Sequence, residues 1–174
     1  MAFGHKKSGL SGPQRGRSRF LENAVDCDDP STMRTRFRTT PGKGLPAEAA
    51  QAMLVLDAVL AESGIEARVL AADHRGIQLD VAGWPLDVGI SVQDGFLRAQ
   101  AQACGHGQVD PHELLHDHRK RAFAKFTHAD GGAVWVEADL PLIAATPELV
   151  DAMLGAFIEA AALARERAKA AQRS

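Results

Sequence analysis

The sequence contains no tyrosine, and aromatic residues make up only 5% of its 174 residues. Proteins that bind single-stranded nucleic acids usually stack the bases on aromatic side chains, so a base-stacking platform is poorly supported. The two cysteines, Cys27 and Cys104, are too few for a disulfide framework. No apolar run reaches 18 residues, and the N-terminus lacks the apolar stretch of a secretory signal. These absences favour a soluble globular protein, which we expect to be cytoplasmic.

The sequence motifs of the common enzyme classes are also missing. We find no phosphate-binding loop, no dinucleotide fingerprint and no nucleophile elbow. Residues His112 to His116 do match the pattern H-E-x-x-H, in which two histidines bind zinc and the glutamate activates a zinc-bound water. However, Asp110 and Pro111 place this pattern at the start of a helix, and no third ligand follows at the expected spacing. We therefore predict no enzymatic activity and no cofactor, and a zinc hydrolase using His112 and His116 is a remote alternative.

Charge is distributed unevenly along the chain. The net charge of −2 combines +5 on residues 1–44 with −7 on the remaining residues. Residues 1–44 are rich in Gly, Ser, Thr and Pro and poor in apolar residues, which predicts a flexible basic arm. The arm either contacts DNA or RNA phosphates, solubilises the chain, or docks on its acidic body. Six arginines in two clusters are the candidate phosphate contacts: Arg15, Arg17, Arg19, Arg34, Arg36 and Arg38.

Residues 45–171 predict one α+β domain, followed by a short tail at 172–174. Apolar residues at helical spacing after Pro46 predict a helix over about 46–63. From about 67 to 103 the apolar period changes to two, with Gly, Pro and Asp between segments, which predicts an antiparallel meander. Asp110 and Glu113 predict a capping box that starts a second helix, ending near residue 122. A hairpin over 123–140 and a long helix capped by Thr146 complete the domain.

The long C-terminal helix carries an apolar surface wider than one sheet face needs to cover. Such a surface forms either a partner or dimer interface, or the contact faces of a helix buried on two sides of its own fold. The interface interpretation makes Met153, Leu154, Phe157 and Ile158 its anchors. Trp84, at a hairpin turn, and Trp135, in a strand, are further candidate anchors for a protein partner, unless they cap the edges of the core.

Three segments carry a resemblance to a known family: residues 95–98, residues 130–142 with the strand end Asp-Leu-Pro-Leu, and residues 146–154. Together with the order of elements, they resemble the YbjN family, which has the type III secretion chaperone-like fold. The resemblance covers about residues 45–170 and departs from the family at the second helix, where this chain has His116.

The resemblance implies a non-enzymatic, homodimeric protein that binds other proteins. We therefore predict a chaperone-like regulator or adaptor, acting as a homodimer on a protein partner of unknown identity. The alternative belongs to a different functional class: an accessory protein of a nucleic-acid process, whose basic arm contacts DNA or RNA.

Overall fold

The computed structural model describes residues 44–173. The predicted arm and its two arginine clusters lie outside these residues, so the arm and the domain boundary stay predictions. None of the helices in the described part of the chain is long and apolar enough to cross a lipid bilayer.

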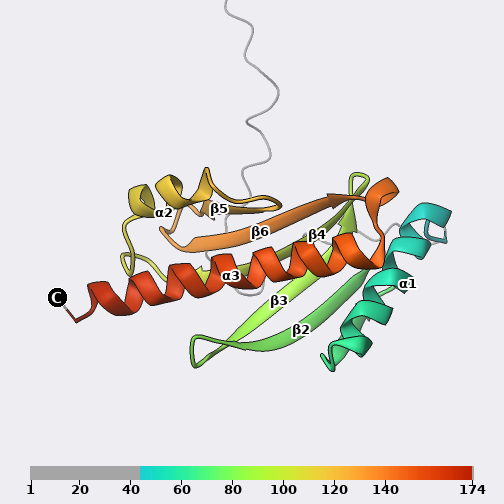
Figure 1. The fold of residues 1–174 in the computed structure, drawn as a ribbon, viewed down its shortest axis with the longest axis horizontal. Helices are drawn as coiled ribbons and strands as arrows, with labels where there is room; N and C mark the ends of the chain where they lie inside the picture. Colours follow the sequence, from blue (N-terminus) through green and yellow to red (C-terminus); the bar gives the residue numbers. More distant parts are fainter. Residues whose placement is uncertain (1–43, 174) are drawn as a thin grey trace, which may run out of the picture.

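The chain folds as a helix, a four-stranded meander, a short helix, a hairpin and a long helix, which confirms the predicted α+β class (Figure 1). All neighbouring strands pair antiparallel in one six-stranded sheet of order β1-β2-β3-β4-β6-β5. The elements are α1 (Ala47–Glu62), β1 (Ala67–Ala71), β2 (His74–Val81), β3 (Trp84–Gln93), β4 (Phe96–Cys104), α2 (Pro111–His118), β5 (Ala124–His128), β6 (Val134–Pro141), a 3-10 turn (Leu142–Ala144) and α3 (Pro147–Ala171).

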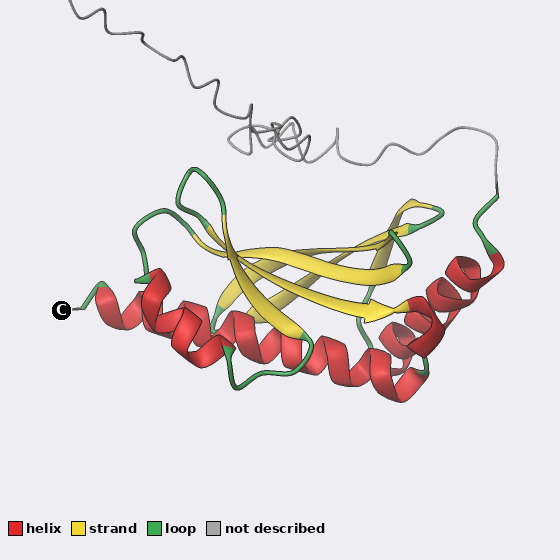
Figure 2. Ribbon diagram, turned by 90° about the horizontal axis from the view of Figure 1, so that it is seen from above, coloured by secondary structure: helices red, strands yellow, loops and turns green. Residues whose placement is uncertain are grey.

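The core lies between one face of the sheet and the helices. Figure 2 shows the helices along one side of the sheet, with α3 running across its strands. The sheet contributes alternate residues to this core, and many of them on β4 and β6 are small, such as Ala99, Ala101 and Ala138. Small side chains let a helix approach a sheet closely, and α3 meets them with Ala160 and Ala164, which are also buried.

Two arginines join elements that are distant in the sequence. Arg75 on β2 makes two hydrogen bonds of 2.8 Å to the carboxylate of Asp57, which attaches α1 to the sheet. Arg165 on α3 donates to four backbone carbonyls at the β2–β3 hairpin and the end of β4. Fork-shaped guanidinium groups suit such multiple contacts, so both arginines fix how the helices sit on the sheet.

The second helix differs from its prediction in length and in capping. It ends at His118 rather than near residue 122, because the His118 Nδ1 accepts a hydrogen bond of 3.0 Å from the backbone N–H of Phe126 on β5. This contact requires the chain to turn back directly after the helix. Asp110 is the N-cap, as predicted, but it accepts from the N–H of His112. The predicted reciprocal capping box does not form, because the Glu113 carboxylate binds Arg167 instead.

Candidate functional site

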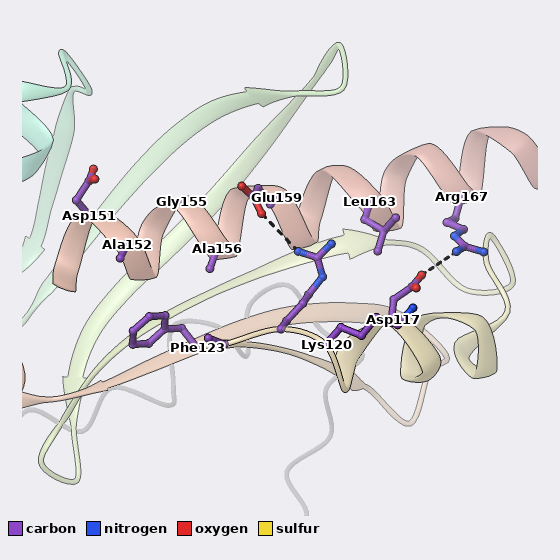
Figure 3. Close-up of a pocket in the computed structure, with 12 residues that line it drawn as sticks. Asp117, Lys120, Phe123, Asp151, Ala152, Gly155, Ala156, Glu159, Leu163 and Arg167 are labelled. Atoms are coloured by element: carbon purple, nitrogen blue, oxygen red, sulfur yellow. Dashed lines mark hydrogen bonds and ion pairs between the residues drawn. The ribbon is translucent and has the colours of Figure 1, made fainter. Parts of the chain in front are cut away.

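A groove of about 700 Å³ lies between α3 and residues 119–123, which connect α2 to β5 (Figure 3). We call it the α3 groove. Small residues of α3 form its floor: Ala152, Gly155 and Ala156. Two larger apolar side chains flank this floor, Leu163 on α3 and Phe123 on the segment that connects α2 to β5. Residues three or four positions apart share one helix face, so the α3 side chains present a single continuous surface.

The floor of the α3 groove is open to solvent. Ala152 and Gly155 are exposed, and a side chain placed on Gly155 would project into open space. Ala156 and Leu163 are half-buried. An apolar side chain from outside can therefore lie on this helix face without displacing any part of the fold.

Phe123 is the unusual residue of the α3 groove. Its φ of 61° lies in the left-handed region, which costs a bulky L-residue roughly 1–2 kcal/mol. The side chain is nevertheless 38% exposed, so burial offsets only part of this cost. Such strain persists where the surrounding structure enforces it, and it concentrates at functional sites. This conformation could not be predicted from the sequence, because no glycine or asparagine marks the position.

The rim of the α3 groove carries charges of both signs. Arg167 donates to Glu113 at 2.9 Å and to Asp117 at 2.7 Å, which ties α3 to α2. Arg121 lies 3.8 Å from Glu159 (Figure 3). Among the residues described, Asp151 and Lys120 also line the groove and form no ion pair. A partner segment can thus find either charge beside the apolar floor.

The histidines and Cys104 of the described part of the chain do not gather into a metal centre. Within residues 44–173, no three His, Cys, Asp or Glu side chains are grouped so that they could hold a metal ion. His112 in the first turn of α2 and His116 in its last turn are both exposed, and Arg167 binds Glu113, which lies between them in the sequence. Burial raises the pKa of the Cys104 thiol against the opposing charge of Arg165, which disfavours a reactive thiolate.

The structure corrects three of the predicted partner anchors. Met153 and Phe157 are 0% exposed and Leu154 is 6% exposed, because α3 packs on the sheet and α1 packs on α3. The wide apolar surface is therefore mostly the contact face of a helix buried within its own fold. Ile158 is half-buried outside the α3 groove.

The two tryptophans lie apart from the α3 groove. Trp84 is exposed at the start of β3, and Trp135 is half-buried on β6. The predicted anchors do not lie together at one site. The solvent-facing small residues of α3 and Phe123 do lie together, but the periodicity of the sequence did not reveal them.

A network of charges lies on the sheet face opposite the helices. Asp139 accepts hydrogen bonds from Arg98 at 2.5 Å and from Lys125 at 2.7 Å. Burial opposes ionisation of Asp139, but these two hydrogen bonds outweigh it and hold its pKa below the ordinary value. The network links β4, β5 and β6, so its role is to join strands.

The sequence matches no protein-family model and no curated protein. Among solved structures, the chain is similar to a chain of the HopA1–SchA chaperone–effector complex, with 12% identity and a TM-score of 0.55 over 71% of this chain and 99% of that chain. A chain from the complex of the Yersinia pestis type III secretion chaperone SycH with a fragment of YscM2 has 15% identity and a TM-score of 0.46, over 64% and 98%. The first similarity confirms the predicted chaperone-like fold. Membership of the YbjN family stays a prediction.

Proposed function

We propose that this chain is a non-enzymatic protein-binding module, a chaperone or adaptor, that holds a segment of a partner protein in the α3 groove. The observation that carries the proposal is the half-exposed, strained Phe123 beside an open floor of small residues. The similar solved structure with a TM-score of 0.55 supports it, because that structure is described as a chaperone–effector complex.

The α3 groove suits an apolar side chain carried on an extended or helical segment. Such a side chain would contact Ala152 and Gly155 on one side and the ring of Phe123 on the other. Complete burial of one Leu or Phe side chain is worth about 1.5–3 kcal/mol, so one or two anchors provide modest, reversible binding. The mixed charges on the rim would then orient the segment and add specificity.

A matched pair of substitutions tests this site. Ala152→Arg places a long charged side chain over the floor, and Ala171→Arg makes the same change at the end of α3, outside the α3 groove. Proteins captured from the native cell by the wild-type chain should be lost with Ala152→Arg and kept with Ala171→Arg. Circular dichroism checks that both variants fold. Equal capture by both variants would overturn the assignment to this groove.

We also propose that the protein is a homodimer, as its resemblance to the YbjN family implies. Since Met153, Leu154 and Phe157 lie in the core, a second copy would have to use surfaces other than these three residues. Light scattering at micromolar concentration should give twice the chain mass of 18.6 kDa. A mass of one chain would contradict the dimer and leave the binding role of the α3 groove unaffected.

A further inference from the structure

The edge strand β1 leaves apolar side chains and one row of backbone groups uncovered. Among the residues described, β1 pairs only with β2, so its other side offers unpaired N–H and C=O groups. Val69 is 71% exposed and Leu70 is 58% exposed. An edge strand with exposed apolar side chains is a template for a further strand, and proteins usually cover or charge such edges.

Acidic side chains surround this edge. Arg75 binds Asp57, and Arg68 lies 4.0 Å from Asp87, so both nearby arginines already have carboxylate partners. Three further acidic residues near the ends of β1 form no ion pair within residues 44–173: Glu62, Glu66 and Asp73. Glu66 also lines a hollow of about 510 Å³ beyond the end of β1, where β2 continues unpaired on that side. The edge therefore favours a strand that carries positive charge.

The chain itself contains a segment with the matching pattern. Residues 34–39 read Arg-Thr-Arg-Phe-Arg-Thr, so arginine alternates with threonine and phenylalanine. In a strand, this period of two places the three arginines on one face and Phe37 on the other. Threonine and phenylalanine favour strands, and Pro41 and Gly42 follow as a turn signal.

The length of the connection limits which part of β1 this segment can reach. The structure places residues 44–46, so residues 40–43 form the connection, and the path from residue 39 to Gly44 spans at most about 16–18 Å. Val69 in the middle of β1 pairs with Arg75, which binds Asp57 in α1. Asp57 lies ten residues beyond Ala47, about 15 Å along the helix axis. Pairing therefore has to begin at the part of β1 that lies nearest to the start of α1.

We propose that residues 34–39 pair with β1 as an additional strand of the sheet. Phe37 then covers exposed apolar surface at Val69 or Leu70, and the arginines face the acidic residues around the edge. This strand blocks the edge against other chains. The inference is independent of the α3 groove, because it concerns the opposite edge of the sheet.

Hydrogen exchange in the full-length protein tests the proposal. Phe37→Pro removes both a backbone donor and the apolar side chain, whereas Ser31→Pro makes the same backbone change outside the segment. Phe37→Pro should speed exchange of β1 amides at least tenfold, while Ser31→Pro leaves them as in the wild type. Exchange of the central strand β4 should be unchanged in both variants, which shows that the fold is intact.

Charge provides a second measurement. Replacing Arg34, Arg36 and Arg38 together by glutamate should also speed β1 exchange, because the arginines would no longer meet acidic neighbours. Equal β1 exchange in the wild type and in both the Phe37→Pro and the charge-reversed chains would overturn the proposal. β1 protection that disappears on dilution would overturn it in favour of a second copy, because an intrachain strand does not depend on concentration.

Discussion

Arg165→Met should destabilise the fold by separating α3 from the β2–β3 hairpin. The Arg165 guanidinium donates to the carbonyls of Val81 and Ala103 at 3.1 and 3.2 Å in partly buried positions. It also donates to Trp84 and Pro85 at 2.7 and 2.9 Å in exposed positions. Methionine keeps an unbranched apolar stem but provides no donor, so the substitution removes all four hydrogen bonds.

The loss of stability in Arg165→Met depends on how well water replaces each hydrogen bond that Arg165 made. A hydrogen bond to a charged group contributes about 1.5–3 kcal/mol when removal leaves a buried partner, and much less where water takes its place. The two partly buried carbonyls therefore dominate, and we expect the free energy of unfolding to fall by about 3 kcal/mol. With a urea m-value of about 2 kcal/mol/M, the unfolding midpoint should drop by about 1.5 M. Arg165→Lys should recover less than half of this loss, because one ammonium group cannot reach all four carbonyls.

The matched control for this substitution is Arg173→Met. Arg173 is exposed, and its side chain makes no hydrogen bond or ion pair within the described residues, so its loss should shift the midpoint by less than 0.25 M, or about 0.5 kcal/mol. Urea unfolding followed by far-UV circular dichroism measures both variants with the same m-value. Equal midpoints for Arg165→Met and Arg173→Met would refute the idea that Arg165 holds α3 to the hairpin.

Three further predictions concern the strand network, the α3 groove and the basic segment. Because Arg98 and Lys125 hold the pKa of Asp139 below its ordinary value, its stabilisation is complete above about pH 4 and is lost as pH falls through the folded-state pKa. Asp139→Asn should therefore lower the free energy of unfolding at pH 7 by about 1 kcal/mol, and stability should then fall less steeply as the pH is lowered. Urea unfolding at several pH values measures both effects, and a pH dependence equal to that of the wild type would contradict the prediction. Phe123→Gly relieves the left-handed strain, so thermal unfolding should show little or no loss of stability, while capture of the partner should fall. A fall in stability of about 2 kcal/mol or more would contradict this prediction. If the arginine clusters contact nucleic acid, DNA retention should weaken steeply with salt and disappear when the six arginines are replaced by serine; retention that is equal and insensitive to salt would exclude such contacts.

The sequence was informative wherever local chemistry decides the structure. Thr146 and Asp110 were recognised as helix caps, and both accept the expected kind of backbone hydrogen bond. Alternation of apolar residues identified the strands, since one face of the sheet packs on the helices, although the edge strand β1 contains no buried residue. The predicted end of α2 was wrong, because a tertiary hydrogen bond from Phe126 to His118 ends the helix before the point that the local sequence indicates.

The candidate site was harder to predict than the fold. The apolar width of α3 shows how much of the helix is buried, but not whether another chain or the same chain buries it. Here α1 and the sheet cover Met153 and Phe157, so the residues that looked most like anchors are core. The open floor of the α3 groove consists of Ala152 and Gly155, which carry no binding signal in a sequence, and the neighbouring Phe123 has a conformation that only the fold imposes.

The two proposed surfaces should act independently because they lie at opposite edges of the sheet. The α3 groove adjoins β5, whereas β1 is the strand at the other end of the order. Sites that share no residues and no packed side chains usually contribute additively. Ala152→Arg should therefore leave β1 exchange unchanged, and Phe37→Pro should leave capture of the groove's partner unchanged. If Phe37→Pro instead increased capture, the partner would compete for the β1 edge, and the α3 groove would not be the only binding surface.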